Sequence, residues 1–519
     1  MIALLRRHLF PLSLLAIVVA NLLLSAWKIL YAPLVNKDAI LYLIAAEKIV
    51  ASGLPAAVDI YNWPMFHILM AWLHQLSGLP LLASGQLIMT ACFILLTLGF
   101  CRVVRDLGGD DRTVLFAFLV ILCLPTVTDL RSSLVRDPGL LAFMLLALSQ
   151  QLRFAANPSW RHCLCWAGYI FMAFLFRVEA LALALLAPLA MLLVTGQPLA
   201  RRLSLCLQLA ALPVAASILG LALAHLLLPE GLAKIKVIVD LGFMVDGARN
   251  LAVDFSQRAA IIGHQVLAEF SAGDAGYAYL AALLAIVVVN LFSAVSLPYA
   301  LPLIAAGRWR SPPSSGARVV LFYGLVVLAY LCLFTLIARF NLTRYCLQLA
   351  VLLLLALPFV FTRLWHKPSA RTTLVRGLIG FLIFANAMDG LISQERRKAY
   401  IRDAALWARE APAIGQDQLI SNEPYIAYFS TKSTTDTVLR AINASRQPLL
   451  ETVDTYWLAS HLYAYRVRQG EQEQALRADI ARADGTVLRH FPGRDNRSVV
   501  VFQIGKDVQR SALLLERPE

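Results

Sequence analysis

Apolar runs long enough to cross a membrane recur along most of this 519-residue chain. A helix of roughly 20 apolar residues spans the hydrocarbon core of a bilayer, so each run is a candidate membrane span. Because lipid offers a backbone no hydrogen-bond partners, spans of this kind fold as helices. We therefore predict a polytopic α-helical membrane protein. Its spans, about eleven, are predicted at residues 9–31, 79–101, 113–129, 138–152, 162–176, 178–196, 203–228, 277–305, 318–338, 345–362 and 373–391.

The composition agrees with a chain that lies mostly in lipid. Hydrophobic residues make up 59% of the sequence and charged residues 15%, whereas soluble domains contain roughly 45–50% and about 25%. A soluble protein this apolar would expose large patches and aggregate, and the same composition excludes a disordered chain. The eight cysteines fall in or beside apolar runs, so we expect neither a disulfide scaffold nor a cysteine zinc site.

The net charge of +14 belongs mainly to the apolar part of the chain. Residues 392–519 carry 18 basic and 16 acidic side chains, and the rest of the chain carries 28 and 16. The surplus falls in alternate loops, for example at Arg6-Arg7 and Arg201-Arg202, which is the positive-inside pattern. It predicts a cytoplasmic N-terminus and, with an odd number of spans, an outer C-terminal segment. The charge gives no reason to expect a nucleic-acid partner.

The last 128 residues have a different character. Residues 394–411 read as a charged helix, residues 418–421 as a short strand, and residues 486–504 contain two runs of alternating polarity. Mixed helix and strand signals without a long apolar run indicate a soluble domain. We predict a small extracytoplasmic α/β domain at 392–519.

Residues 1–391 form the predicted membrane domain, with two long outer loops at 32–64 and 229–276. The segment from His67 to Leu76 is too short to span and is predicted to be a helix near the membrane interface. The 229–276 loop mixes basic and apolar residues, which favours either a helix on the membrane surface or a structural lid.

Ionisable side chains close to a membrane are costly and often functional. Several lie where predicted spans meet the outer face, and a set of cations around a few carboxylates suits an anion such as a phosphate. Each residue also has a structural explanation as an interfacial anchor or a helix cap, as for Asp38 after Asn36-Lys37 or Asp137 before Pro138. The candidates are Lys37, Asp38, Asp59, Arg131, Arg136, Asp137, Arg177, Glu179, Arg339 and Arg344.

Four short patterns follow one another in the membrane half. The first outer loop carries Asp38, then Tyr42, Ala46 and Gly53, and then Tyr61-Asn62-Trp63-Pro64. Further along come Arg136-Asp137 at the start of a span, Arg177-Val178-Glu179 at a turn, and Arg344-Tyr345 before a leucine-rich span.

In this order the patterns resemble the GT-C superfamily of membrane glycosyltransferases. The resemblance is to the branch that contains protein O-mannosyltransferases and the lipid A aminoarabinose transferase, also described as glycosyltransferase family 39-like. It covers nearly the whole membrane half, and a soluble outer domain at the C-terminus is common among bacterial members.

The resemblance implies a GT-C fold and an inverting transfer of a sugar from a polyprenyl-phosphate carrier to an acceptor at the outer face. The acceptor, a glycan, lipid or protein, would lose a proton to the first-loop acid, Asp38. The departing phosphate would be held by Arg136, Arg177 and Arg344, with Arg131 and Arg339 as further candidates. Possible sugar or metal contacts are Asp59, Asp137 and Glu179.

The sequence departs from the family pattern in two places. The first loop has a lone Asp38 where many members show two adjacent acids, so no cofactor is predicted beyond a possible divalent metal. Asn62-Trp63-Pro64 stands where many members read Lys-Pro-Pro, which leaves the donor sugar and the acceptor open.

Two other functions remain open from the sequence. A lipid-linked glycan polymerase or ligase also uses outer-face arginines, but usually carries its large loop between late spans. A lipid-linked oligosaccharide flippase or other transporter would more usually have paired halves and no outer α/β domain. Arginine outnumbers lysine 37 to 9, which favours a GC-rich bacterial genome and hence the bacterial inner membrane.

Overall fold

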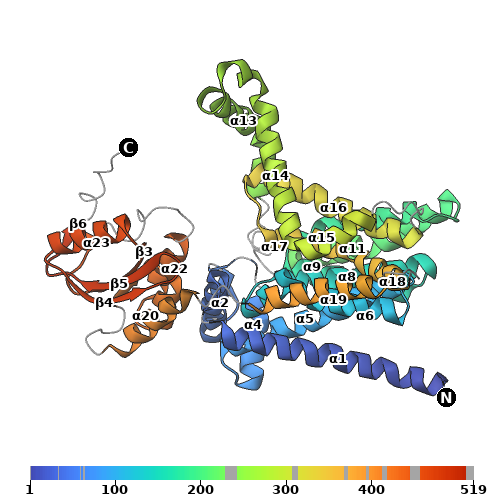
Figure 1. Ribbon diagram of the computed structural model, residues 1–519, viewed down its shortest axis with the longest axis horizontal. Coiled ribbons are helices and arrows are strands. Elements are labelled where there is room, and N and C mark those ends of the chain that lie inside the picture. The colour runs from blue at the N-terminus through green and yellow to red at the C-terminus, as the bar shows by residue number, and fades with distance from the viewer. Residues whose placement is uncertain are drawn as a thin grey trace.

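The computed structural model is largely helical, with a small sheet near the C-terminus (Figure 1). The strands lie beyond α2 (Lys37–Ser52), while the N-terminus lies at the far end of α1 (Ile2–Tyr31). The structure describes residues 2–32, 34–58, 60–61, 63, 65–227, 242–306, 314–366, 372–392, 397–411, 418–444 and 456–509.

The helices of the membrane part alternate between long spans and short connecting pieces. The remaining helices of this part are α3 (Pro55–Val58), α4 (Met65–Ser77), α5 (Leu81–Asp106), α6 (Asp111–Leu122), α7 (Pro125–Asp129), η1 (Leu130–Ser132), α8 (Asp137–Ala156), α9 (Trp160–Phe176), α10 (Ala180–Leu186), η2 (Ala187–Leu193), α11 (Leu199–Leu227), α13 (Gly242–Gln265), η3 (Glu269–Asp274), α14 (Ala275–Val295), α15 (Leu297–Ala306), α16 (Ser315–Ala338), α17 (Thr343–Leu354), α18 (Leu357–His366) and α19 (Thr372–Leu391).

The chain is a multi-pass membrane protein, but the predicted count of about eleven spans is not confirmed. Within the described residues, seven helical segments are long and apolar enough to cross a membrane, or eight if the bent pair α6 and α7–η1 forms one span. The prediction at 162–176 corresponds to α9, which has only 17 residues. The prediction at 178–196 corresponds to α10 and η2, where the helix changes type close to Pro188, because proline cannot donate the next helical hydrogen bond.

The centre of the membrane part is α8, which packs against α5 and α9. Gly99 of α5 permits this close approach, because a Cβ there would lie 3.0 Å from Cβ of Leu145. Small residues let helix backbones come together in membranes. Most of α8 is buried, which fixes the position of its first residue, Asp137.

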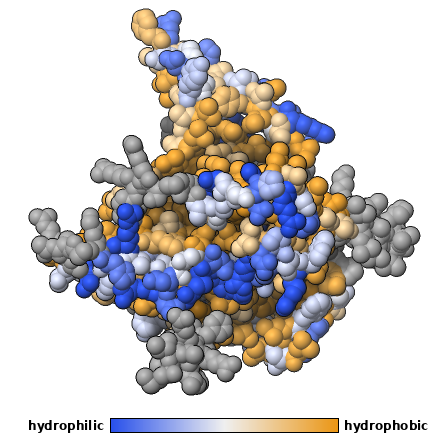
Figure 2. Space-filling view, turned by 90° about the vertical axis from the view of Figure 1, so that its right-hand side faces the viewer, coloured by the Kyte–Doolittle hydropathy of each residue, from blue (hydrophilic) through white to orange (hydrophobic). Residues whose placement is uncertain are grey.

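One face of the membrane part collects charged loops (Figure 2). A hydrophilic band crosses an otherwise apolar surface on the side remote from the C-terminal sheet. The helix ends beside the loops that join α5 to α6 and α8 to α9 carry an ion pair between Arg153 and Asp106, at 2.9 Å, and a hydrogen bond between Arg112 and His366. These are loops that the charge pattern assigns to the cytoplasmic side.

The C-terminal part is an α/β unit, as expected. Its sheet has the order β1-β3-β5-β4; β1 runs parallel to β3, and the other pairs are antiparallel. The strand predicted at 418–421 is β1, and the two runs predicted in 486–504 are β4 and β5. Its elements are α20 (Ala399–Glu410), β1 (Leu419–Ser421), α21 (Pro424–Phe429), α22 (Thr435–Ala444), β2 (Tyr456–Trp457), β3 (Leu462–Arg468), α23 (Glu471–Arg482), β4 (Thr486–Pro492), β5 (Arg497–Gln503) and β6 (Val508–Gln509).

The run of valines in β5 is explained by burial on both faces of the sheet. Val499 and Val501 pack in the cluster that includes α20, whereas Val500 and Phe502 pack in the cluster that includes α23. A strand covered on both faces is apolar at successive positions.

The C-terminal unit contacts the membrane part through α2. Ile40, Leu41 and Ile44 of α2 share a buried cluster with Val438 and Ile442 of α22. The hydroxyl of Tyr428 donates a hydrogen bond to the carboxylate of Glu47. Helix α2 is therefore held by the unit that we predict to be a separate domain; the boundary after residue 391 stays a prediction.

Candidate functional site

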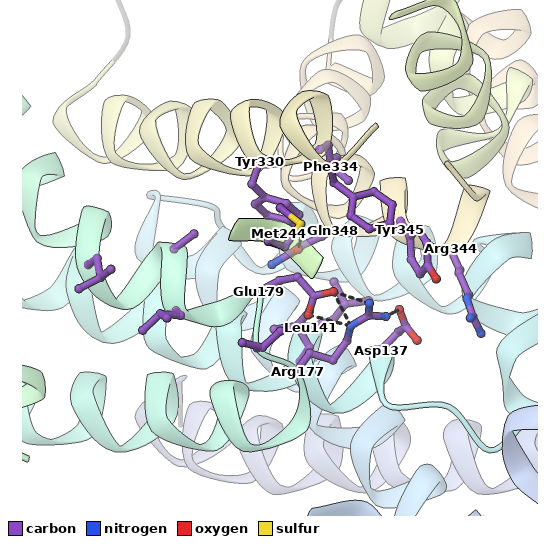
Figure 3. Close-up of a pocket in the computed structure, with 16 residues that line it drawn as sticks. Asp137, Leu141, Arg177, Glu179, Met244, Tyr330, Phe334, Arg344, Tyr345 and Gln348 are labelled. Atoms are coloured by element: carbon purple, nitrogen blue, oxygen red, sulfur yellow. Dashed lines mark hydrogen bonds and ion pairs between the residues drawn. The ribbon is translucent and has the colours of Figure 1, made fainter. Parts of the chain in front are cut away.

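A cavity of about 470 Å³ opens between the starts of α8 and α17 and the turn that joins α9 to α10 (Figure 3). One part of its wall is charged and another is apolar. The lining residues are Asp137, Leu140, Leu141, Arg177, Val178, Glu179, Leu181, Ala182, Leu185, Met244, Tyr330, Leu331, Phe334, Arg344, Tyr345 and Gln348.

Arg177 is the centre of the charged wall. Its Nη1 lies 2.5 Å from a carboxylate oxygen of Asp137, and its Nη2 lies 2.5 Å from one of Glu179. Its Nε also donates to Glu179. Both carboxylates and the guanidinium are mostly buried, so Arg177 serves to compensate two acids at the cavity wall.

A second ion pair brings together residues 306 positions apart. Nη1 of Arg344, in the first turn of α17, donates to a carboxylate oxygen of Asp38 at 2.9 Å. The Nε of Arg344 is buried and has no hydrogen-bond partner in the described part of the chain. Arg344 therefore has an N–H donor left for a ligand, whereas the Nε, Nη1 and Nη2 atoms of Arg177 all donate to carboxylates.

Tyr345 separates the two arginines. The guanidinium carbons of Arg177 and Arg344 lie 5.1 and 5.3 Å from the centre of its ring. Cations are attracted to the face of an aromatic ring. Tyr345 thus links the two ion-paired groups into one charged wall.

Asp38 uses its carboxylate for an ion pair and not for the helix cap that the sequence also allowed. α2 has Asn36 at its N-cap position, and Asp38 lies in the first turn. The neighbouring Lys37 lies close to Glu423 and Arg466 of the C-terminal unit: burial lowers its pKa below the ordinary value, Glu423 raises it and Arg466 lowers it further. Lys37 therefore belongs to the contact with that unit, whereas Asp38 is not among the lining residues and is joined to the cavity through its ion pair with Arg344.

Arg136 lies beside the cavity and precedes α8 as its N-cap residue. Its guanidinium carbon stands 5.1 Å from the centre of the Tyr61 ring. No carboxylate lies within ion-pair distance of Arg136 among the residues that the structure describes. Arg177, Arg339 and Arg344 each have such a partner.

Two other candidate arginines lie elsewhere. Arg131 is 2% exposed and donates to Asn21 and Ser25 of α1, so it holds η1 against the first helix. Arg339 lies 3.4 Å from Asp254 of α13 and lines a separate, smaller cavity. The last candidate, Asp59, lies outside the described residues.

The described residues give little support to a metal site. They contain no group of three or more His, Cys, Asp or Glu side chains placed to hold a metal ion. The two carboxylates at the cavity wall are engaged by Arg177. No step of the chemistry below depends on a metal.

Two uncharged polar residues of the cavity, Tyr330 and Gln348, were not predicted from the sequence. Tyr330 donates its hydroxyl proton to the side-chain oxygen of Gln348, and both line the cavity. Gln348 follows Arg344 by one helical turn, and a glutamine within a leucine-rich span is a signal that could have identified it. Asn36 also carries no charge, so the charge pattern that identifies Asp38 gives no signal for it.

Comparisons with known proteins give structural matches only. No protein-family model matches the sequence, and no curated protein matches it. A crystal structure of ArnT from Cupriavidus metallidurans bound to undecaprenyl phosphate matches with a TM-score of 0.52 and 15% identity, covering 97% of this chain and 99% of that one. The apo structure of the same protein matches with a TM-score of 0.50, 14% identity and the same coverage.

A weaker match is the Archaeoglobus fulgidus oligosaccharyltransferase in complex with zinc and sulfate. Its TM-score is 0.46 at 14% identity, over 76% of this chain and 55% of that one. At the identity of the two ArnT matches, what is shared is the fold. The chain therefore has a GT-C type membrane fold with a small C-terminal sheet, as the resemblance in its sequence predicted.

Proposed function

We propose that the protein is a glycosyltransferase that moves a sugar from a polyprenyl-phosphate carrier to an acceptor at the outer face of the bacterial inner membrane. The observation that carries this proposal is the cavity itself. A single space of about 470 Å³ joins an apolar wall to a wall of arginines and carboxylates, as a phosphate on a hydrocarbon chain requires.

The apolar wall suits the isoprenoid chain. Leu181, Ala182 and Leu185 of α10 lie on it, together with Met244 and Phe334. Leu185 is 64% exposed, so this side of α10 meets the lipid as well as the cavity. The isoprenoid chain of a carrier could therefore enter from the bilayer and stay in contact with apolar side chains.

The phosphate is assigned to Arg344 and Arg136. Arg344 has an unpartnered Nε, and Arg136 has no carboxylate at ion-pair distance among the described residues. Arginine matches phosphate oxygens with paired donors and stays charged near lipid. Arg177 is already bonded to Asp137 and Glu179. Its assigned role is to hold these two acids beside the sugar.

Asp38 is the proposed base. The acceptor oxygen attacks the anomeric carbon, the bond from that carbon to the phosphate oxygen breaks with inversion, and Asp38 takes the acceptor proton. The ion pair between Asp38 and Arg344 supports this role, because the base would then lie next to the group assigned to the departing phosphate. Donors fixed in advance where charge develops lower the barrier.

The proposal is tested with a deletion strain that carries wild-type protein, Asp38→Asn or no protein. Mass spectrometry of its glycolipids, glycans and glycoproteins should show one sugar modification lost on deletion and restored by the wild type only. Loss of a general base typically lowers a rate about 10²–10⁴-fold, while Asn keeps the shape of Asp. The Asn variant must reach the membrane at normal abundance.

Three outcomes contradict parts of the proposal. Full restoration of the sugar modification by Asp38→Asn would show that Asp38 is not the base. Altered glycan length with every sugar linkage still present would favour a polymerase or ligase, and a carrier-linked precursor trapped on the cytoplasmic side would favour a flippase.

A further inference from the structure

Asn36 lies two residues before the proposed base, and its side chain turns away from the helix that it precedes. Its carbonyl accepts from the amide of Ala39, but within the described chain its side chain makes no capping hydrogen bond. Instead, its Nδ2 donates to the carbonyl of Leu134 at 3.0 Å, and its Oδ1 accepts from the amide of Leu134 at 2.9 Å. One side chain thus joins the start of α2 to the segment before α8.

The segment that Asn36 holds leads directly to Arg136. Leu134 and Val135 are 1% and 2% exposed. The side chain of Leu134 fits against Gly85 of α5, where a Cβ would lie 2.9 Å from its Cδ1. A packed segment cannot shift at Leu134 without moving Arg136, which follows two residues later.

We infer that Asn36 is a positioning residue that sets Arg136 relative to Asp38. The inference rests on the proposed function, since it assigns Arg136 to the phosphate and Asp38 to the acceptor. The two groups belong to segments about 100 residues apart in sequence, and the side chain of Asn36 bonds the two segments directly to each other. Misplacement of a reacting group by about 1 Å can lower a rate about 10²-fold.

The variants Asn36→Ala and Asn36→Ser separate positioning from capping. Serine is as good an N-cap as asparagine, so a residue that only caps α2 would tolerate it. A serine hydroxyl is shorter and cannot present a donor and an acceptor side by side to one peptide group. For a positioning residue, Ser should therefore be as harmful as Ala.

The test measures equilibrium binding of undecaprenyl phosphate to the full-length protein in detergent by native mass spectrometry. Both Asn36 variants should bind about tenfold more weakly, roughly the value of one hydrogen bond to a charged group. In an Arg136→Ala background, Asn36→Ala should weaken binding by less than about twofold further, because coupled residues are not additive. Arg344→Ala in the same series reports whether the phosphate site exists.

Asn422 provides a matched control. In the C-terminal unit, its side chain makes the same pair of bonds, donating to the carbonyl of Arg466 at 3.0 Å and accepting from its amide at 2.7 Å. Asn422→Ala should lower thermal stability as much as Asn36→Ala and leave binding of undecaprenyl phosphate unchanged.

The outcomes separate this inference from the proposed function. Wild-type binding by Asn36→Ser, additive effects of Asn36→Ala and Arg136→Ala, or equally weak binding by Asn422→Ala would each overturn the positioning role and leave the proposed function standing. A wild-type protein that does not bind undecaprenyl phosphate, or an Arg344→Ala variant that binds it normally, would overturn both.

Discussion

Arg177 and Arg344 flank the same tyrosine ring but differ in what surrounds them. The side chain of Arg177 is 13% exposed and compensates Asp137 and Glu179, whereas Arg344 is 30% exposed and pairs with an Asp38 that is itself 32% exposed. Removing one partner of a buried ion pair leaves an unpaired buried charge, which costs more than losing a pair that water can replace. Substitution of Arg177 should therefore lower stability, whereas substitution of Arg344 should mainly lower binding.

The prediction at this scale compares Arg177→Ala with Arg344→Ala. Arg177→Ala should lower the free energy of unfolding by about 3–5 kcal/mol, as for other broken buried pairs. Arg344→Ala should change it by no more than about 1 kcal/mol and should instead abolish binding of undecaprenyl phosphate. Thermal melting in detergent and a binding isotherm distinguish the two results. Equal loss of stability in both variants would contradict the assignment of separate roles.

The candidate site residues that could be predicted from the sequence are the charged ones. Asp38, Arg136 and Arg344 are predictable because ionisable residues beside a membrane are rare and stand out. Arg131 carries the same signal, yet its side chain lies against α1, because a sequence does not say which neighbour a helix end will face. Asn36 carries no charge, and its role depends on a contact with Leu134 across 98 residues that no local pattern encodes.

At the scale of elements, a single glycine decides how closely α5 approaches the segment before α8. A Cβ on Gly85 would lie 2.9 Å from Cδ1 and 3.3 Å from Cδ2 of Leu134, and 3.2 Å from the terminal methyl of Met70. Leu134 and Met70 are buried, so neither side chain can move aside freely.

The prediction is that Gly85→Ala is destabilising although Ala favours helices. Overpacking a filled site costs about 1–3 kcal/mol, more than the roughly 1 kcal/mol that Ala gains over Gly in a helix. Gly168 of α9 is the control, since nothing lies within 4 Å of a Cβ built there, and Gly168→Ala should be neutral or stabilising. Melting temperatures of the two variants check this, and equal effects would show that Leu134 is not tightly held.

The elements themselves were predictable to different degrees. Hydropathy located α5, α8 and α16 because each is one continuous apolar helix. It did not show that the run at 178–196 changes from α10 to η2, because hydropathy counts apolar residues and not the helical bonds that a proline removes. β3 was not predicted because its alternation breaks where Tyr465 and Arg466 follow each other, although it lies at the centre of the sheet between β1 and β5.

For the whole molecule, the two ends of the membrane part have different chemistry. Helix α2 and the C-terminal unit lie toward one end, and the hydrophilic band lies on the opposite side (Figures 1 and 2). The charged wall of the cavity is joined to α2 by the ion pair of Arg344 with Asp38. The positive-inside rule assigns the basic loops to the cytoplasm. On this assignment, the cavity and the C-terminal unit share the outer compartment, where a carrier-linked sugar would be used.

The orientation is tested with fusions at two points of the chain. Alkaline phosphatase is active only outside the cytoplasm, so a fusion after Glu519 should be active and a fusion in the loop at Gly108, between α5 and α6, should be inactive. Green fluorescent protein at the same points should give the reverse result, because it folds in the cytoplasm. Fluorescence after Glu519 would place the C-terminal unit and, through its contacts with α2, the whole cavity on the cytoplasmic side. A base and phosphate site facing that compartment would require a cytoplasmic acceptor, and the proposed outer-face reaction would have to be abandoned.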